Sequence, residues 1–157
     1  MQTKFAASLS VSLLILCLAS VSTAAEGQSC SSATAGGAWA FTYSGAVILP
    51  TGAIPVASTG RFSAKGGSLS GTETRSLGGS VADETLTGTY VVDSDCTATY
   101  SFEVFDSGVL VRIATVNVVF DNNGRSVKGI FTSLVLTDGP NLPTVITVTA
   151  AKIFPGE

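Results

Sequence analysis

The amino-acid sequence predicts an all-β protein, folded as an antiparallel up-and-down barrel of about eight strands. From residue 30 onward, apolar and polar residues alternate with a period of two, in segments rich in Val, Thr, Phe and Tyr. No segment in this region repeats apolar residues at helical spacing. Short turn-forming runs separate the segments, which favours a barrel, because a Greek-key sandwich needs a long crossing connection.

The strands are expected, in order, at residues 38–49, 54–64, 67–76, 82–93, 96–105, 109–121, 125–138 and 144–154. Their separators are Pro50-Thr51-Gly52, Lys65-Gly66, Leu77-Gly78-Gly79, Asp93-Ser94-Asp95, Asp106-Ser107-Gly108, Asn122-Asn123-Gly124 and Asp138-Gly139-Pro140-Asn141. Asn123-Gly124 is the strongest hairpin signal, because both residue types tolerate a positive φ.

Glycines inside the expected strands support the barrel. These residues are Gly45, Gly60, Gly71, Gly88 and Gly129. In a barrel they allow a strand to bend or another backbone to approach closely. A bulge in a two-sheet sandwich is the alternative use of such glycines, so the sandwich stays open as the second architecture.

The alternation assigns the largest apolar side chains to single faces of their strands, which makes these faces the expected core. The faces comprise Trp39, Phe41 and Tyr43 in the first strand, Leu86, Gly88, Tyr90 and Val92 in the fourth, and Tyr100, Phe102 and Val104 in the fifth. An eight-stranded barrel is just wide enough to be filled by side chains or to hold one small ligand. The sequence leaves both outcomes open.

The composition excludes several classes of function. Charged residues make up 12% of the 157 residues, the formal net charge is -3, and histidine is absent. An acidic chain with few charges has no basic field to attract phosphates, so we expect no nucleic-acid partner. Without histidine there is no Ser-His or Cys-His nucleophile and no His-based metal site. The cluster Asp93-Ser94-Asp95 does not have the spacing of a calcium loop, and we expect neither a metal nor a cofactor.

The first 25 residues have the layout of a secretory signal peptide. Lys4 supplies the positive charge, an apolar stretch around residues 13–18 follows, and Ser-Thr-Ala-Ala at 22–25 supplies small residues for cleavage. The apolar run is shorter than the roughly 18–20 residues that cross a bilayer, so we expect no membrane span. Cleavage near Glu26 would remove Cys17 and leave residues 26–157 as a single domain in a secreted or periplasmic protein.

Cys30 and Cys96 are the cysteines that remain after cleavage. In an oxidising compartment, such a pair is expected to form a structural disulfide. A redox-active pair is the alternative, but the two residues lack the C-x-x-C spacing.

A series of short motifs resembles a family of small secreted bacterial all-β proteins of unassigned activity. The motifs are Cys30, Gly37-Ala38-Trp39-Ala40-Phe41, Ser70-Gly71-Thr72-Glu73-Thr74, Gly88-Thr89-Tyr90-Val91-Val92 and Asp95-Cys96-Thr97, within residues 30–131. More distantly, the glycine-punctuated strands resemble the barrel shared by allene oxide cyclase and dirigent proteins, and the lipocalin barrel of the calycins. The likeness to allene oxide cyclase and dirigent proteins implies cofactor-free work on a small molecule held in an apolar pocket.

Four residues are the candidates for contacts with a small apolar ligand, namely Glu73, Tyr90, Tyr100 and Arg112. A tyrosine can line an apolar pocket with its ring and offer its hydroxyl, and a carboxylate in such a pocket can act as an acid or base near neutral pH. For Glu73, Arg75, Glu103 and Arg112, however, we favour the usual place of charged residues, the solvated outer face.

Two functions remain open. The first is a non-catalytic module that binds a small apolar molecule or serves as a structural part of an extracellular assembly. The second is a cofactor-free cyclase or isomerase, in which some of these acids and arginines would face an open cavity. The sequence identifies neither the ligand nor the oligomeric state.

Overall fold

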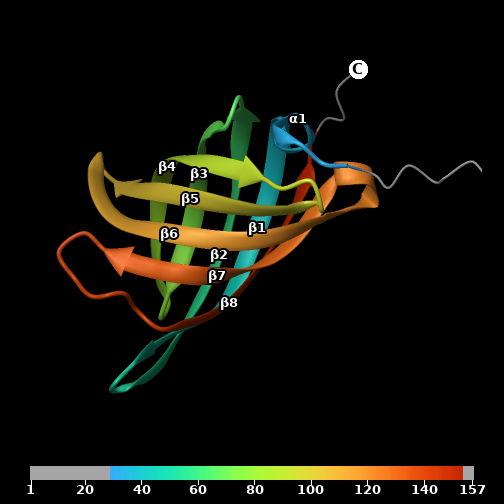
Figure 1. The fold of residues 1–157 in the computed structure, drawn as a ribbon. Coiled ribbons are helices and arrows are strands. Elements are labelled where there is room, and N and C mark those ends of the chain that lie inside the picture. Colours follow the sequence, from blue (N-terminus) through green and yellow to red (C-terminus); the bar gives the residue numbers. More distant parts are fainter. Residues whose placement is uncertain (1–28, 154–157) are drawn as a thin grey trace, which may run out of the picture.

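The computed structural model describes residues 29–153, and these form a closed barrel in which every strand is antiparallel to both neighbours, in sequence order (Figure 1). The elements are α1 (Ser32–Ala35), β1 (Gly37–Leu49), β2 (Gly52–Lys65), β3 (Ser68–Leu77), β4 (Ser80–Val92), β5 (Thr97–Asp106), β6 (Val109–Asp121), the 3₁₀ turn η1 (Asn122–Gly124), β7 (Ser126–Leu136) and β8 (Thr144–Lys152). The predicted all-β up-and-down barrel is confirmed. Each strand boundary lies within two residues of its predicted position.

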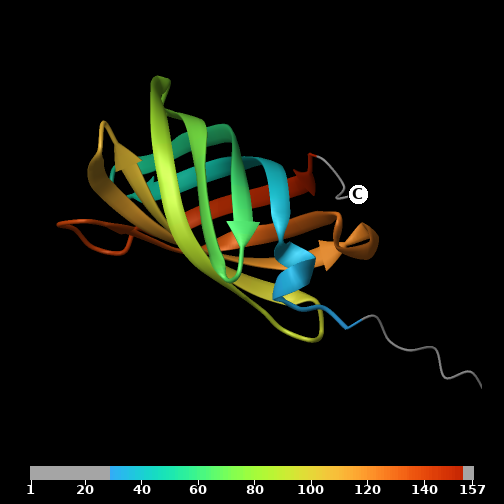
Figure 2. The same cartoon turned by 90° about the horizontal axis from the view of Figure 1, so that it is seen from above.

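The barrel closes because β1 pairs with β2 on one side and with β8 on the other. Figure 2 shows the strands curving into one continuous wall, with α1 at its rim. Two strand glycines permit the close contacts that this curvature needs. A Cβ on Gly71 would collide with the carbonyl oxygen of Arg61, and one on Gly88 with that of Ser101. Both glycines therefore act as the sequence predicts for a barrel.

One end of the barrel is closed by α1. Ala35 and Trp39 have no exposed surface, and the indole Nε1 of Trp39 donates a hydrogen bond to the carbonyl oxygen of Ala35 at 2.8 Å. The predicted disulfide between Cys30 and Cys96 is present and ties the segment before α1 to the turn before β5. The N-terminal segment thus covers the interior at this end, a detail that the period-two pattern did not predict.

The opposite end carries the connections β1–β2, β3–β4, β5–β6 and β7–β8. Here β7 separates from β8, because their pairing stops at Ile130 and Thr147. The connection itself then pairs with β7: Leu142 donates its N–H to the carbonyl oxygen of Leu134, and the side-chain oxygen of Asn141 accepts the N–H of Leu134. The wall is therefore widened at this end by the segment 137–143.

The expected signal peptide, its cleavage near Glu26 and Cys17 all lie outside the described residues. Among residues 29–153, no helix has the length and apolar character needed to traverse a bilayer.

Candidate functional site

The barrel interior contains two cavities that share part of their lining. The inner cavity has a volume of about 50 Å³ and is lined almost entirely by apolar side chains, with Phe41, Phe62 and Tyr100 among them. The second cavity, of about 360 Å³, lies at the end opposite α1 and is called the mouth cavity below. Tyr43, Arg112 and Phe131 line both cavities and separate them.

Aliphatic residues form most of the mouth cavity. They are Val47, Leu49, Ile54, Val56, Leu77, Val111, Leu134, Leu136, Leu142 and Ile146. Arg75, Glu84, Asp106 and Arg112 are the charged residues in its lining. The lining of the mouth cavity is thus mostly apolar, and four side chains carry its charges.

Arg112 joins two buried glutamates at the boundary between the cavities. Its Nη2 donates to Glu73 Oε1 at 2.8 Å and to Glu84 Oε2 at 2.5 Å, and its Nη1 donates to Glu84 Oε1 at 2.7 Å. Arg75 adds Nε and Nη2 bonds to Glu84 Oε1, each at 3.0 Å. Ser58 Oγ donates to Glu73 Oε2 at 2.6 Å. We call Ser58, Glu73, Arg75, Glu84 and Arg112 the ionic layer.

The β3–β4 hairpin explains why two acids meet inside the barrel. The tight turn at Gly78 and Gly79 sets a register in which Glu73 lies directly opposite Glu84. Like charges in such a pair repel. Arg112, on β6, which β5 separates from β4, bonds both carboxylates and offsets the repulsion.

The environment shifts the pKa of the two glutamates in opposite directions. For Glu84, burial opposes ionisation, but the hydrogen bonds from Arg112 and Arg75 outweigh burial and lower the pKa from 4.5 to about 2. For Glu73, burial dominates over the bonds from Ser58 and Arg112 and raises the pKa. Glu73 lines the apolar inner cavity, whereas Glu84 lines the mouth, so the lining agrees with these directions.

Two other groups at the boundary between the cavities, Tyr43 and Arg112, are held in their ordinary charge states. Burial, followed by the nearby charge of Glu73, raises the pKa of Tyr43, which keeps the phenol protonated. Burial disfavours the charge on Arg112, but its bonds to Glu84 outweigh that effect and raise its pKa. Within the ionic layer, burial thus favours the protonated form of Glu73, whereas the arginines favour the ionised form of Glu84.

The Glu84→Gln variant should change how stability depends on pH. A depressed pKa means that Glu84 stabilises the folded protein above pH 4.5 and loses this contribution as the pH falls toward 2. The raised pKa of Glu73 acts in the opposite sense, since its contribution is lost as the pH rises through the folded-state pKa. Urea unfolding between pH 2 and 7 should show a smaller acid-side loss for Glu84→Gln than for the natural chain. Glu103→Gln on the outer face is the matched control, and equal acid-side slopes in all three proteins would contradict the assignment.

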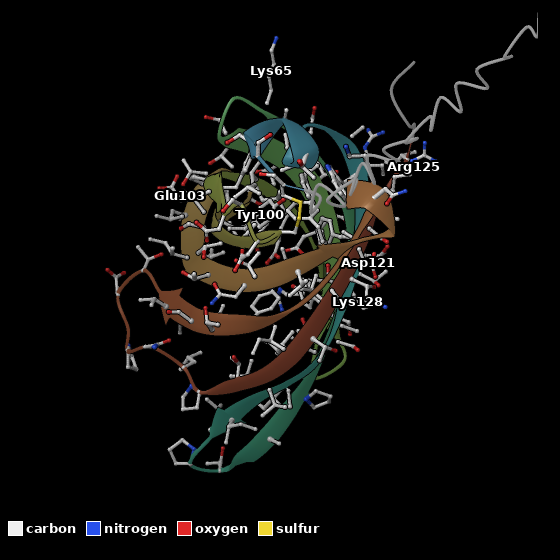
Figure 3. The ribbon with its side chains drawn as sticks, turned by 45° about the vertical axis from the view of Figure 1, so that its right-hand side comes forward. Lys65, Tyr100, Glu103, Asp121, Arg125 and Lys128 are labelled. Carbon is white, nitrogen blue, oxygen red and sulfur yellow. A yellow bond between two sulfur atoms is a disulfide. The ribbon has the colours of Figure 1, made fainter. Side chains whose placement is uncertain are left out.

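The structure brings some of the predicted residues together and separates others. Glu73 and Arg112 form an ion pair, and with Arg75 they lie inside the barrel, so the favoured outer-face interpretation is wrong for these three. The reason is that each has a charge partner inside: Arg75 pairs with Glu84, and Arg112 pairs with Glu73 and Glu84. Glu103 does lie on the outer face, where Figure 3 shows it pointing away from the barrel.

The two predicted tyrosines stack on each other with ring centroids 5.5 Å apart. Tyr100 lines the inner cavity and lies inside the barrel in Figure 3. Tyr90 lines neither cavity, and its hydroxyl donates to the carbonyl oxygen of Ser32 in α1 at 3.3 Å. Its position is therefore that of a packing residue beneath the closed end.

Sequence reasoning missed Glu84, Ser58 and the role of Tyr43 in the wall between the cavities. A signal for Glu84 was present, because it precedes Leu86 by two residues and so shares the inward face of Leu86 and Tyr90. The turn residues Gly78 and Gly79 would have placed it opposite Glu73. Ser58 had no comparable signal.

The fold has a counterpart among solved structures. The chain resembles a redesigned β-barrel, mFAP1, solved bound to DFHBI. The match has a TM-score of 0.50 at 15% sequence identity and covers 78% of this chain and 98% of the other. No protein-family model and no curated protein matches the sequence. At this identity, the similarity to mFAP1 concerns the barrel architecture.

Proposed function

We propose that this protein binds a small apolar molecule in the mouth cavity, as an exported protein. The observation that carries the proposal is the cavity itself, with a volume of about 360 Å³ and a mostly aliphatic lining. Pockets for small molecules typically measure about 300–1,000 Å³, combine apolar walls with a few polar groups, and often lie in the mouths of β-barrels. The charged groups beside the aliphatic wall would orient the ligand.

Two further observations support binding. The barrel mFAP1, of similar architecture, is bound to DFHBI, which agrees with a ligand site within such a barrel. The interior of this chain is also divided, because the inner cavity of about 50 Å³ is far smaller than the mouth. An empty apolar cavity of about 150 Å³ is known to accept benzene, so the inner cavity is too small for a ligand of that size. The mouth is therefore the proposed site.

Export is supported by the disulfide. A Cys30–Cys96 bridge fits an oxidising compartment, as does the signal-like sequence of the first 25 residues.

Titration with the uncharged fluorescent probe N-phenyl-1-naphthylamine tests the binding site. Leu77→Asn should weaken probe binding about tenfold, since it replaces an aliphatic mouth residue with a polar one and removes part of the apolar contact. Val81→Asn is the matched control, because Val81 is 67% exposed on the neighbouring strand. A probe that does not bind, or binds equally to both variants, would count against the mouth site.

A cofactor-free cyclase or isomerase is the second candidate, and Glu73 is the observation that favours it. Its carboxyl lines an apolar cavity, and burial there raises its pKa, which favours the protonated form that a general acid needs. Small molecules co-purified with the protein from its natural host would separate the two functions. A binding module should return the extracted molecule unchanged after incubation, whereas an isomerase should convert it into a product of equal mass, and Glu73→Gln should abolish that conversion.

A further inference from the structure

We propose that the mouth cavity selects an uncharged aliphatic molecule that carries a hydroxyl group, and rejects the matching carboxylate and ammonium compounds. This inference rests on the proposed function, since it names the class of ligand for the same site. It follows from the walls of the cavity, from the hydrogen bonds already made by its arginines, and from the balance of charge around it.

The walls of the mouth favour an aliphatic ligand. Ten branched aliphatic side chains line it, and its aromatic members, Tyr43 and Phe131, form a T-shaped pair with centroids 5.0 Å apart at the boundary with the inner cavity. The two rings therefore contact each other edge to face and do not offer a flat surface on which a ligand ring could stack. Contact with such a wall is dispersive and non-directional, so it scales with the apolar area of the ligand.

Both arginines of the mouth are already engaged. Arg75 is held by Glu84, while Arg112 is held by Glu84 and by Glu73. A carboxylate ligand that sought a two-point bond with Arg112 would have to displace Glu84 or Glu73, which are both buried. At Arg75 it would have to share a guanidinium whose Nε and Nη2 already bond Glu84. A glutamate displaced in this way would stay buried and would lose hydrogen bonds that stabilise its charge, which is strongly unfavourable.

The charge balance gives a second reason for rejecting an anion. The groups at the site are the guanidiniums of Arg75 and Arg112 and the carboxyls of Glu73, Glu84 and Asp106. With all of them ionised, two positive charges face three negative charges. If Glu73 is protonated, the charges are equal. The site has no net positive charge in either state, so an anionic ligand gains no net attraction.

An ammonium ligand is disfavoured for a different reason. It would lose its hydration inside an apolar cup, and both guanidiniums lie beside the carboxylate of Glu84 that it would approach. A hydroxyl avoids this cost because it is neutral, and it can donate a hydrogen bond to a carboxylate oxygen and accept one from a guanidinium. The mixed donors and acceptors of the ionic layer therefore match an alcohol.

Displacement of N-phenyl-1-naphthylamine by ligands of equal chain length tests the inference. At pH 7, 1-decanol should displace the probe at a concentration about tenfold or more below those of decanoate and decylammonium. Decanoate should gain affinity as the pH falls below about 4.5, where its own carboxyl becomes neutral. Equal or tighter binding of either charged compound at pH 7, or no binding of decanol by a protein that binds the probe, overturns the inference.

The Glu84→Gln variant tests whether the carboxylate of Glu84 causes the rejection of a carboxylate ligand. Removing this carboxylate frees the guanidiniums of Arg75 and Arg112. The ratio of the displacing concentration of decanoate to that of decanol should therefore fall about tenfold. Glu103→Gln, on the outer face, should leave the ratio unchanged. An unchanged ratio in Glu84→Gln contradicts the selectivity. If neither the probe nor any of the three compounds binds the natural protein, it is the proposed function itself that fails.

Discussion

Replacing Arg112 with methionine is expected to lower the free energy of unfolding by about 3–5 kcal/mol, the cost of breaking a buried ion pair from one side. Arg112 is 9% exposed and bonds both Glu73 and Glu84. Methionine fills similar space without charge, which leaves two carboxyls facing each other across the β3–β4 hairpin. Urea unfolding at pH 7 measures the loss.

Arg61→Met is the control for this prediction. Arg61 lies exposed on the outer face of β2, so its replacement should change stability by no more than about 0.5 kcal/mol.

A second comparison separates the effect of charge from the effect of packing. The triple variant Arg112→Met/Glu73→Gln/Glu84→Gln should be more stable than Arg112→Met alone, because it buries no unpaired carboxylate. A loss below about 1 kcal/mol in Arg112→Met would show that the ionic layer does not hold the barrel together.

The Cys30→Ser/Cys96→Ser variant is expected to lose about 4 kcal/mol of stability. The disulfide joins residues 66 positions apart, and closing a loop of that length restricts the unfolded chain by about this amount. The loss should be accompanied by greater solvent exposure of Trp39, the single tryptophan, since its indole is bonded to α1 beneath the tethered segment. Urea unfolding followed by tryptophan fluorescence reports both effects.

Reduction provides the matched test of the disulfide. Dithiothreitol should destabilise the natural protein by nearly the same amount and should leave the double variant unaffected. The prediction does not hold if the double variant keeps its stability to within about 1 kcal/mol, or if the reductant destabilises both proteins equally.

The proposed ligand site was only partly predictable, because side chains from distant strands build it. Arg112 meets Glu73 across 39 positions of sequence and Glu84 across 28. Each strand's pattern placed these residues on a face, but the pattern alone did not identify that face as the interior. A charged side chain is stable inside only with partners, and the partners are known only once the barrel has closed and the register of every strand is set.

The mouth also depends on tertiary structure. The turn residues predicted a loop near Asp138-Gly139-Pro140-Asn141, but not that it would pair with β7 and widen the wall. The short helix α1 has four residues, too few for a periodic signal, and its position over the closed end depends on packing against Trp39 and Tyr90.

The strands and their boundaries could be predicted from the sequence, and the barrel was the favoured arrangement, because alternation and turn chemistry are local properties of the chain. The sequence also determined the cysteine pair, since Cys30 and Cys96 were the candidates left for a bridge. The burial of Glu73, Glu84 and Arg112 in one layer could be seen only in the closed barrel, as could the division of the interior into a small inner cavity and a larger mouth. The physical reason is that burial and charge pairing are properties of the closed barrel, in which strands far apart in sequence face the same interior.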